Sequence, residues 1–169
     1  NFDEIELDIF MSYFQYIDET LHVEDVSVNS IAESVGTPFY VYSARTISKN
    51  YMQFKSALAP LHHSIYFAMK ANSNLAILKT LKNLGAGMDV VSVGEYLRAQ
   101  AVGISGEKIV FSGVGKTPDE IKIALQRGIK QFNVESEPEL DVINTVAKSL
   151  GKIAPISIRV NPDVDAKTH

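Results

Sequence analysis

Short apolar runs recur along the chain at an almost constant spacing from residue 64 onward. Each run is about as long as a β-strand, and each stretch between two runs has room for one helix and two loops. Strand and helix alternating at a fixed period predict βα units that form a parallel sheet. The runs start near Ile65, Met88, Ile109, Phe132 and Ile156, so the steps are 23, 21, 23 and 24 residues.

Four amphipathic stretches lie between these runs, and a glycine follows each of them. Glycine tolerates the left-handed backbone conformation that commonly ends a helix, so each glycine predicts a helix C-terminus. We expect helices at residues 75–84, 95–102, 119–127 and 138–150, closed by Gly85, Gly103, Gly128 and Gly151.

The residues before this repeat follow a different pattern. Residues 21–28 alternate in the manner of a short strand. The following stretch predicts a short helix that begins at Asn29 or Ser30, either of which suits an N-cap, and stops at Gly36. Residues 39–43 are rich in aromatic and β-branched side chains and predict another strand.

Two features favour a (β/α)8 barrel over a doubly wound sheet, which would give the same order of elements. The period barely varies, and polar residues gather at the carboxyl end of every run, where barrel enzymes place their active sites. The strands are apolar almost throughout, as expected where both sheet faces are covered. Because a barrel needs eight units and five are visible, we expect residues 37–169 to be the first part of a truncated barrel, with about three units after His169.

Composition narrows the classes of function. The net charge of −4 argues against a nucleic-acid partner, because binding to phosphates calls for a basic face. The chain has no cysteine and therefore no disulfide or thiolate metal site. It has no apolar run of the roughly 20 residues that a membrane helix needs, and its acidic first segment is unlike a secretory signal. We expect a cytoplasmic protein without membrane contact.

Lys70 is the leading candidate for chemistry, because it ends the first repeating strand directly after an apolar run. Apolar neighbours would disfavour the ammonium form, and a neutral amine is what chemistry with an aldehyde cofactor requires. A solvated lysine in a loop is the alternative that position alone leaves open.

Asp89 and Arg159 are charged residues within apolar runs, where an unpaired charge is costly. Lys70, at the end of the neighbouring strand, is the expected partner of Asp89, although a structural strand-end cap is an equal alternative. Arg159 would need an anion, either an electron-rich cofactor oxygen or the carboxylate of Asp89 or Glu135.

Two other motifs point to no site. Residues 112–117, "SGVGKT", lack the first glycine of a phosphate-binding loop, because Val110 stands there. Gly113 and Gly115 are therefore expected to shape a turn. The adjacent His62 and His63 have no third ligand nearby and are expected to be a surface pair, so no metal site is predicted.

Six segments together resemble the fold-type III pyridoxal-phosphate-dependent decarboxylases, which include ornithine and arginine decarboxylases and are related to alanine racemase. "YFAMKAN" at residues 66–72 is similar to the motif that carries the cofactor lysine of that family. The last segment, "RVNPDVDAKTH", resembles the diaminopimelate branch of the family more than the other branches. The remaining segments lie in order at residues 36–43, 85–99, 111–117 and 132–136.

The resemblance implies a barrel that binds pyridoxal 5'-phosphate, plus a β-domain to which residues 1–36 contribute strands. Lys70 would hold the cofactor covalently, Asp89 would lie beside the lysine and the cofactor, and Arg159 would lie near the cofactor ring and its phenolic oxygen. The implied reaction is decarboxylation of a small amino-acid substrate, meso-2,6-diaminopimelate, to L-lysine in a homodimer with shared active sites. Other parts of the site would lie beyond His169, so these residues alone would be inactive.

Three other functions stay open from sequence. One is a different decarboxylase or a racemase of the same fold, and another is an unrelated barrel of the sugar-phosphate type. The third is a non-catalytic barrel that binds the cofactor for homeostasis. That kind of barrel lacks the β-domain, so the strand-like pattern of the first 36 residues argues against it.

Overall fold

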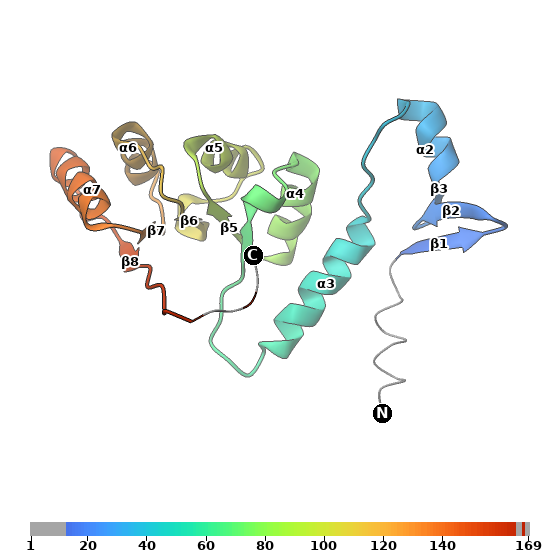
Figure 1. Ribbon diagram of the computed structural model, residues 1–169, viewed down its shortest axis with the longest axis horizontal. Coiled ribbons are helices and arrows are strands. Elements are labelled where there is room, and N and C mark those ends of the chain that lie inside the picture. Colours follow the sequence, from blue (N-terminus) through green and yellow to red (C-terminus); the bar gives the residue numbers. More distant parts are fainter. Residues whose placement is uncertain (1–12, 165–166, 168–169) are drawn as a thin grey trace. The chain divides into compact units, whose positions relative to one another are not determined.

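The computed structural model describes residues 13–164 and residue 167, and its contacts group the chain into two compact units. The first unit is Asn1–His62 and the second is His63–His169 (Figure 1). The predicted division at residue 37 concerns the domains of the complete protein and stays a prediction. In the described part of the chain, no helix is both long and apolar enough to cross a membrane.

The described residues of the first unit, 13–62, form a small antiparallel sheet and two helices. The three strands pair in the order β1-β2-β3. The elements are β1 (Phe14–Ile17), β2 (Thr20–Val23), β3 (Val26–Ser27), α2 (Val28–Val35) and α3 (Ala44–Ala57).

Three predictions for this unit are wrong in detail. The single strand expected at residues 21–28 is two strands, because Glu24, with a φ of 54°, turns the chain between β2 and β3. Helix α2 is capped by Ser27 rather than Asn29 or Ser30, since the Ser27 hydroxyl accepts a hydrogen bond from the Asn29 N–H at 3.2 Å. Residues 39–43 form no strand, and no segment among residues 13–164 pairs with them in a hydrogen-bond ladder.

The second unit confirms the predicted βα repeat. Its five parallel strands pair in sequence order, β4-β5-β6-β7-β8, and these are five of the eight units of the predicted barrel. Each strand is shorter than the apolar run that predicted it. The strands are β4 (Tyr66–Ala68), β5 (Gly87–Val90), β6 (Ile109–Phe111), β7 (Gln131–Val134) and β8 (Ile156–Ile158).

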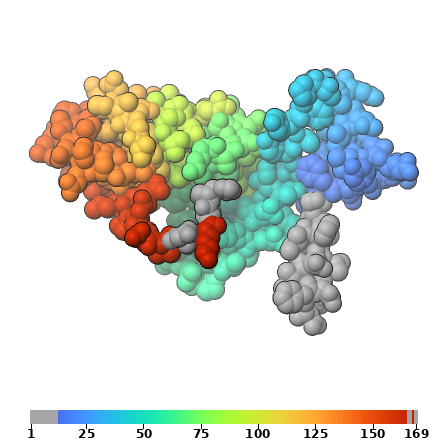
Figure 2. Space-filling model, in the orientation of Figure 1, coloured from blue at the N-terminus to red at the C-terminus, as the bar shows by residue number. Residues whose placement is uncertain are grey.

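Four helices follow the first four of these strands and agree with the predicted ranges to within two residues. All four glycines expected to close them have a positive φ, from 63° at Gly151 to 103° at Gly85. The helices lie in sequence order, each against the next, and α6 and α7 form one continuous surface (Figures 1 and 2). They are α4 (Leu75–Leu84), α5 (Val93–Ala101), α6 (Pro118–Gln126) and α7 (Glu137–Ser149); two short 3-10 turns, η1 (Met69–Ala71) and η2 (Gly106–Lys108), precede α4 and β6.

The two faces of this sheet differ in chemistry. One face packs against the helices and forms the core, in which the rings of Phe111 and Phe132 stack with centroids 6.1 Å apart. The strand register puts alternate residues on the opposite face, which we call the inner face. The sequence had suggested strands that are apolar almost throughout, and this expectation is wrong for the inner face. The polar residues of the inner face are Asp89, Gln131, Asn133 and Ser157.

A hydroxyl residue caps each of the helices α5, α6 and α7, and a glutamate three residues later reaches back to the backbone before the helix. This arrangement satisfies N–H groups that have no partner within the helix. It also fixes the angle at which each helix leaves its strand. The pairs are Ser92 with Glu95, Thr117 with Glu120, and Ser136 with Glu139.

Glu120 also joins two neighbouring helices. One carboxylate oxygen accepts a hydrogen bond from the Val93 N–H, at the start of α5, at 2.9 Å. The other accepts from the Thr117 N–H and hydroxyl, both at 3.0 Å. Burial raises the pKa of Glu120, but these hydrogen bonds outweigh it, so the pKa lies below its ordinary value of 4.5.

Gly87 allows close packing between β4, which leads into the turn that carries Lys70, and β5, which carries Asp89. A Cβ at this position would lie 2.5 Å from the Tyr66 ring and 2.7 Å from the backbone oxygen of Lys108. We expect Gly87→Ala to lower the free energy of unfolding of the complete protein by about 1–3 kcal/mol, because the backbone must shift. Urea denaturation measures the change. The control is Gly115→Ala, whose Cβ would meet open space; equal losses in the two variants would contradict the packing argument.

Glu120→Gln removes an acceptor from the junction of α5 and α6 and should lower the free energy of unfolding by about 1 kcal/mol at pH 7. The Glu120 pKa is lowered by folding, so the stability that its carboxylate adds is present above the unfolded pKa and is lost as the pH falls through the folded pKa. The difference in the free energy of unfolding between variant and parent should therefore become smaller below about pH 4.5. Urea denaturation across this range tests it, with the exposed Glu107→Gln as control. A difference that does not change with pH would refute the assignment.

Candidate functional site

The carboxyl ends of the parallel strands carry the three residues that the sequence singled out. Lys70 lies in η1, two residues after the end of β4. Asp89 lies within β5, opposite Ala68 of β4, so these two residues belong to neighbouring strand ends. Arg159 directly follows β8, three strands farther along the sheet. All three therefore lie toward the edge at which barrel enzymes build their sites.

Lys70 is exposed, which corrects the expectation that apolar neighbours desolvate it. Within the described residues its ammonium group makes no hydrogen bond or ion pair. The turn η1 causes this exposure, because it carries Lys70 past the end of the strand while the side chain before it, Met69, is buried. The result is a primary amine that is accessible and has no partner among the described residues.

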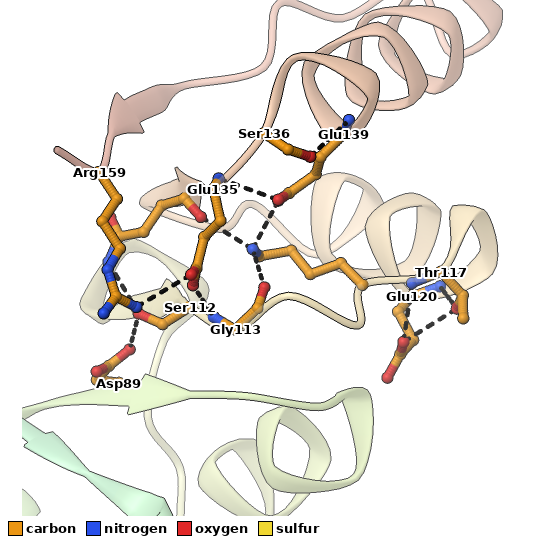
Figure 3. Close-up of polar contacts among 11 residues, drawn as sticks. Asp89, Ser112, Gly113, Thr117, Glu120, Glu135, Ser136, Glu139 and Arg159 are labelled. Atoms are coloured by element: carbon orange, nitrogen blue, oxygen red, sulfur yellow. Dashed lines mark hydrogen bonds and ion pairs between the residues drawn. The ribbon is translucent and has the colours of Figure 1, made fainter. Parts of the chain in front are cut away.

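The predicted pairing of Asp89 with Lys70 is not found in the structure. The Asp89 carboxylate instead accepts a hydrogen bond of 2.5 Å from the hydroxyl of Ser112, the residue that follows β6 (Figure 3). The strand register explains the choice, because β6 lies directly beside β5 and puts Ser112 on the inner face, whereas Lys70 has left its strand. The alternative, a strand-end cap for a neighbouring amide, is not the arrangement found either, because the donor is a hydroxyl.

Arg159 is an exposed residue rather than a buried one, with 57% of its side chain accessible. Its guanidinium forms an ion pair of 3.0 Å with Glu135, one of the two carboxylates that the sequence had offered (Figure 3). Glu135 follows β7 and is itself held by the Gly113 N–H at 2.7 Å. Glu135 thus holds one side of the Arg159 guanidinium, while more than half of the side chain stays accessible.

A cleft of about 330 Å³ opens beside these groups on the inner face. It is polar, with hydroxyl, amide, carboxylate and guanidinium groups in its wall. Such a lining suits a small charged or highly polar molecule. The residues that line it are Ser112, Asn133, Glu135, Ser157 and Arg159.

A buried lysine, which sequence reasoning missed, stabilises one side of this cleft. The Lys116 side chain is fully buried, and its ammonium group donates to the Glu139 carboxylate and the Gly113 carbonyl, each at 2.6 Å. It also donates to the Asn133 carbonyl at 2.9 Å. The same Glu139 accepts a hydrogen bond from the Glu135 N–H at 3.0 Å. Lys116 therefore connects the loop after β6 to β7 and to the start of α7.

The chain does contain one signal for these residues. The pattern Ser or Thr, two residues, then Glu occurs at each junction before α5, α6 and α7, and it is the signature of a capping box. It marks Glu139 as a junction residue. No local pattern reveals how Ser112, Asn133 and Lys116 connect neighbouring strands, because the hydrogen bonds that do so join residues 17 to 23 positions apart.

Comparison with known proteins identifies the family to which this chain is similar. A family model described as "Pyridoxal-dependent decarboxylase, pyridoxal binding domain" matches residues 44–169. A diaminopimelate decarboxylase of Vibrio cholerae is 53% identical over 160 residues, which are 94% of this chain and 38% of that protein. The chain thus spans well under half of the length of this curated relative.

Solved structures agree with the sequence matches. The crystal structure of diaminopimelate decarboxylase from Helicobacter pylori complexed with L-lysine matches with a TM-score of 0.80 and 48% identity, over 83% of this chain and 36% of that one. An arginine decarboxylase of Paramecium bursaria Chlorella virus matches less well, with a TM-score of 0.66 and 25% identity over 80% and 37% of the chains.

The contribution of the buried ion pair between Lys116 and Glu139 to stability can be tested by substitution. Lys116→Met should lower the free energy of unfolding of the complete protein by about 3–5 kcal/mol, because it leaves a buried carboxylate without its counter-ion. The double variant Lys116→Met/Glu139→Gln should recover part of this loss. Urea denaturation measures these two variants and Glu139→Gln alone, and Lys122→Met, on the exposed surface of α6, is the control. If the double variant lost the sum of the two single losses, the pair would not be coupled.

Proposed function

The chain belongs to the pyridoxal-dependent decarboxylase family, and from this we propose that the complete protein converts meso-2,6-diaminopimelate to L-lysine and carbon dioxide, the last step of lysine biosynthesis. The Vibrio cholerae relative, at 53% identity, supports this substrate, since it is named a diaminopimelate decarboxylase. The Helicobacter pylori structure was solved with L-lysine, the proposed product. Identity falls to 25% for the arginine decarboxylase, which argues against that substrate.

The single observation that carries the proposal is the free amine of Lys70. A cofactor that is an aldehyde needs a primary amine without a competing partner, and Lys70 meets this need within the described residues. The guanidinium of Arg159 uses one edge to bind Glu135 and has further N–H donors for an electron-rich oxygen. The donor set therefore fits pyridoxal 5'-phosphate, with Lys70 as covalent anchor, Asp89 beside it and Arg159 near the phenolic oxygen.

Each of these residues has a task that follows from its chemistry. Lys70 retains the cofactor through its side-chain nitrogen, and Asp89 contributes a negative charge from the neighbouring strand end. Arg159, held by Glu135, provides a fixed positive charge at the wall of the cleft. When bound, the cofactor supplies the electron sink for the pair of electrons left behind as carbon dioxide departs.

We propose further that the complete protein acts in the cytoplasm as a homodimer with shared active sites, without nucleic-acid or membrane partners. The family resemblance of the sequence supports the dimer. The acidic balance of the chain, with a net charge of −4, supports the absence of a nucleic-acid partner.

Replacement of Lys70 tests the assignment. In the complete protein, Lys70→Ala should abolish lysine release from meso-diaminopimelate and the visible absorbance of cofactor that stays bound through gel filtration, because the covalent anchor is gone. Lys79→Ala, on the exposed surface of α4, is the matched control and should keep both.

Substrate choice is read from the same assay. The parent protein should release carbon dioxide from meso-diaminopimelate and not from ornithine or arginine. Retention of bound cofactor and turnover by Lys70→Ala would overturn the role of Lys70. A preference for ornithine or arginine would overturn the proposed substrate but leave the cofactor site intact.

A further inference from the structure

Four polar side chains form a continuous row across the inner face of three neighbouring strands. The Gln131 amide donates to the Asn133 side-chain oxygen at 2.9 Å. The Asn133 amide donates to the Ser112 hydroxyl at 2.9 Å, and the Ser112 hydroxyl donates to the Asp89 carboxylate at 2.5 Å. The row therefore begins on β7, crosses the end of β6 and finishes at a carboxylate on β5.

The Asp89 carboxylate, at the end of the row, fixes which group donates in each of its hydrogen bonds. An ionised carboxylate can only accept hydrogen bonds, so Ser112 must use its single proton toward Asp89. The Ser112 oxygen is then available only as an acceptor for Asn133, whose side-chain amide group must donate to it. This choice turns the Asn133 oxygen toward Gln131. Every hydrogen bond in the row thus points toward Asp89, and hydrogen bonds aligned in this way strengthen one another.

A serine hydroxyl on its own can rotate between three staggered positions. In this row the Asn133 amide occupies an acceptor site of the Ser112 oxygen, and the Asp89 carboxylate takes the proton. Ser112 also lines the cleft that Arg159 borders. It therefore sits between the cleft and the carboxylate, without a charge of its own.

We propose that Ser112 is a positioning residue that, supported by Asn133, holds the Asp89 carboxylate in the one orientation in which it serves the cofactor. The inference rests on the proposed function, in which Asp89 lies beside the cofactor and Lys70. It adds that the orientation of Asp89 is set by two uncharged residues, Ser112 just after β6 and Asn133 on β7. In this proposal Ser112 acts through Asp89 rather than on the cofactor directly.

The test measures cofactor binding rather than turnover. The apoprotein of the complete chain is titrated with pyridoxal 5'-phosphate, and the dissociation constant is read from absorbance. Ser112→Ala should raise this constant about tenfold, the usual effect of losing a hydrogen bond to a charged group. Ser112→Thr keeps the hydroxyl and should stay close to the parent. Ser149→Ala, whose hydroxyl bonds only to a backbone oxygen on α7, is the matched control and should bind as the parent does.

A double-mutant cycle separates positioning from direct contact. Asp89→Ala should weaken cofactor binding, and adding Ser112→Ala to it should have no further effect, because the group that Ser112 orients is gone. If Ser112→Ala weakened binding equally in both backgrounds, Ser112 would contact the cofactor itself and the inference would be wrong. If Asp89→Ala weakened binding and Ser112→Ala did not, the inference would fail while the proposed function stood. No effect of Asp89→Ala would overturn both the inference and the proposed role of Asp89.

Asn133→Asp provides an independent test that keeps the size and shape of the side chain. The new carboxylate cannot donate to Ser112, so the single proton of the hydroxyl is contested by two acceptors. We expect a loss of cofactor affinity as large as that of Ser112→Ala. The backbone oxygen of Asn133, which binds Lys116, is unchanged by the substitution. Parent-like affinity in a folded Asn133→Asp protein, judged by circular dichroism, would contradict the row as a functional unit.

Discussion

The buried ammonium group of Lys116 holds together the part of the molecule on which the candidate site is built. A charge removed from water is tolerated only when its donors are satisfied, and here three oxygens satisfy them. These oxygens belong to Gly113, Asn133 and Glu139, on three successive segments, so each segment is fixed relative to the others. Gly113 can then donate to Glu135, which binds Arg159. A lysine with no chemical task thus determines where a proposed cofactor residue lies.

Two networks with different physical properties meet after β6. The first runs from Lys116 through Glu139 to the backbone of Glu135 and consists of charged groups with little exposure, so breaking it costs stability. The second is the row that ends at Asp89, in which neutral groups donate in one direction toward a single charge. Because the row lies on the partly open inner face, it can be altered with less risk to the fold. The charged network therefore supports the site, whereas the row is proposed to orient the Asp89 carboxylate within it.

The sequence predicts the repeat well and the side-chain partners poorly, for a physical reason. Strand period and closing glycines are local properties, so the order of elements in the second unit and the ends of its helices follow from them. A strand also needs a neighbour, which is why the aromatic stretch at residues 39–43 is not one. Lys70 could be singled out by its motif. Its expected pairing with Asp89 was wrong, because a turn of three residues removes Lys70 from the register that brings Ser112 to Asp89.

The side chains proposed to hold the cofactor keep donors that the described residues do not use. In the described part of the chain, every buried side-chain nitrogen or oxygen has a hydrogen-bond partner. Among the same described residues, the Lys70 amine has no partner, and Arg159 uses only one side of its guanidinium. A ligand with an aldehyde group needs a side chain of this kind, exposed and without a partner among these residues. The donors that the described residues leave available thus lie toward the strand ends, where the cofactor is proposed to bind.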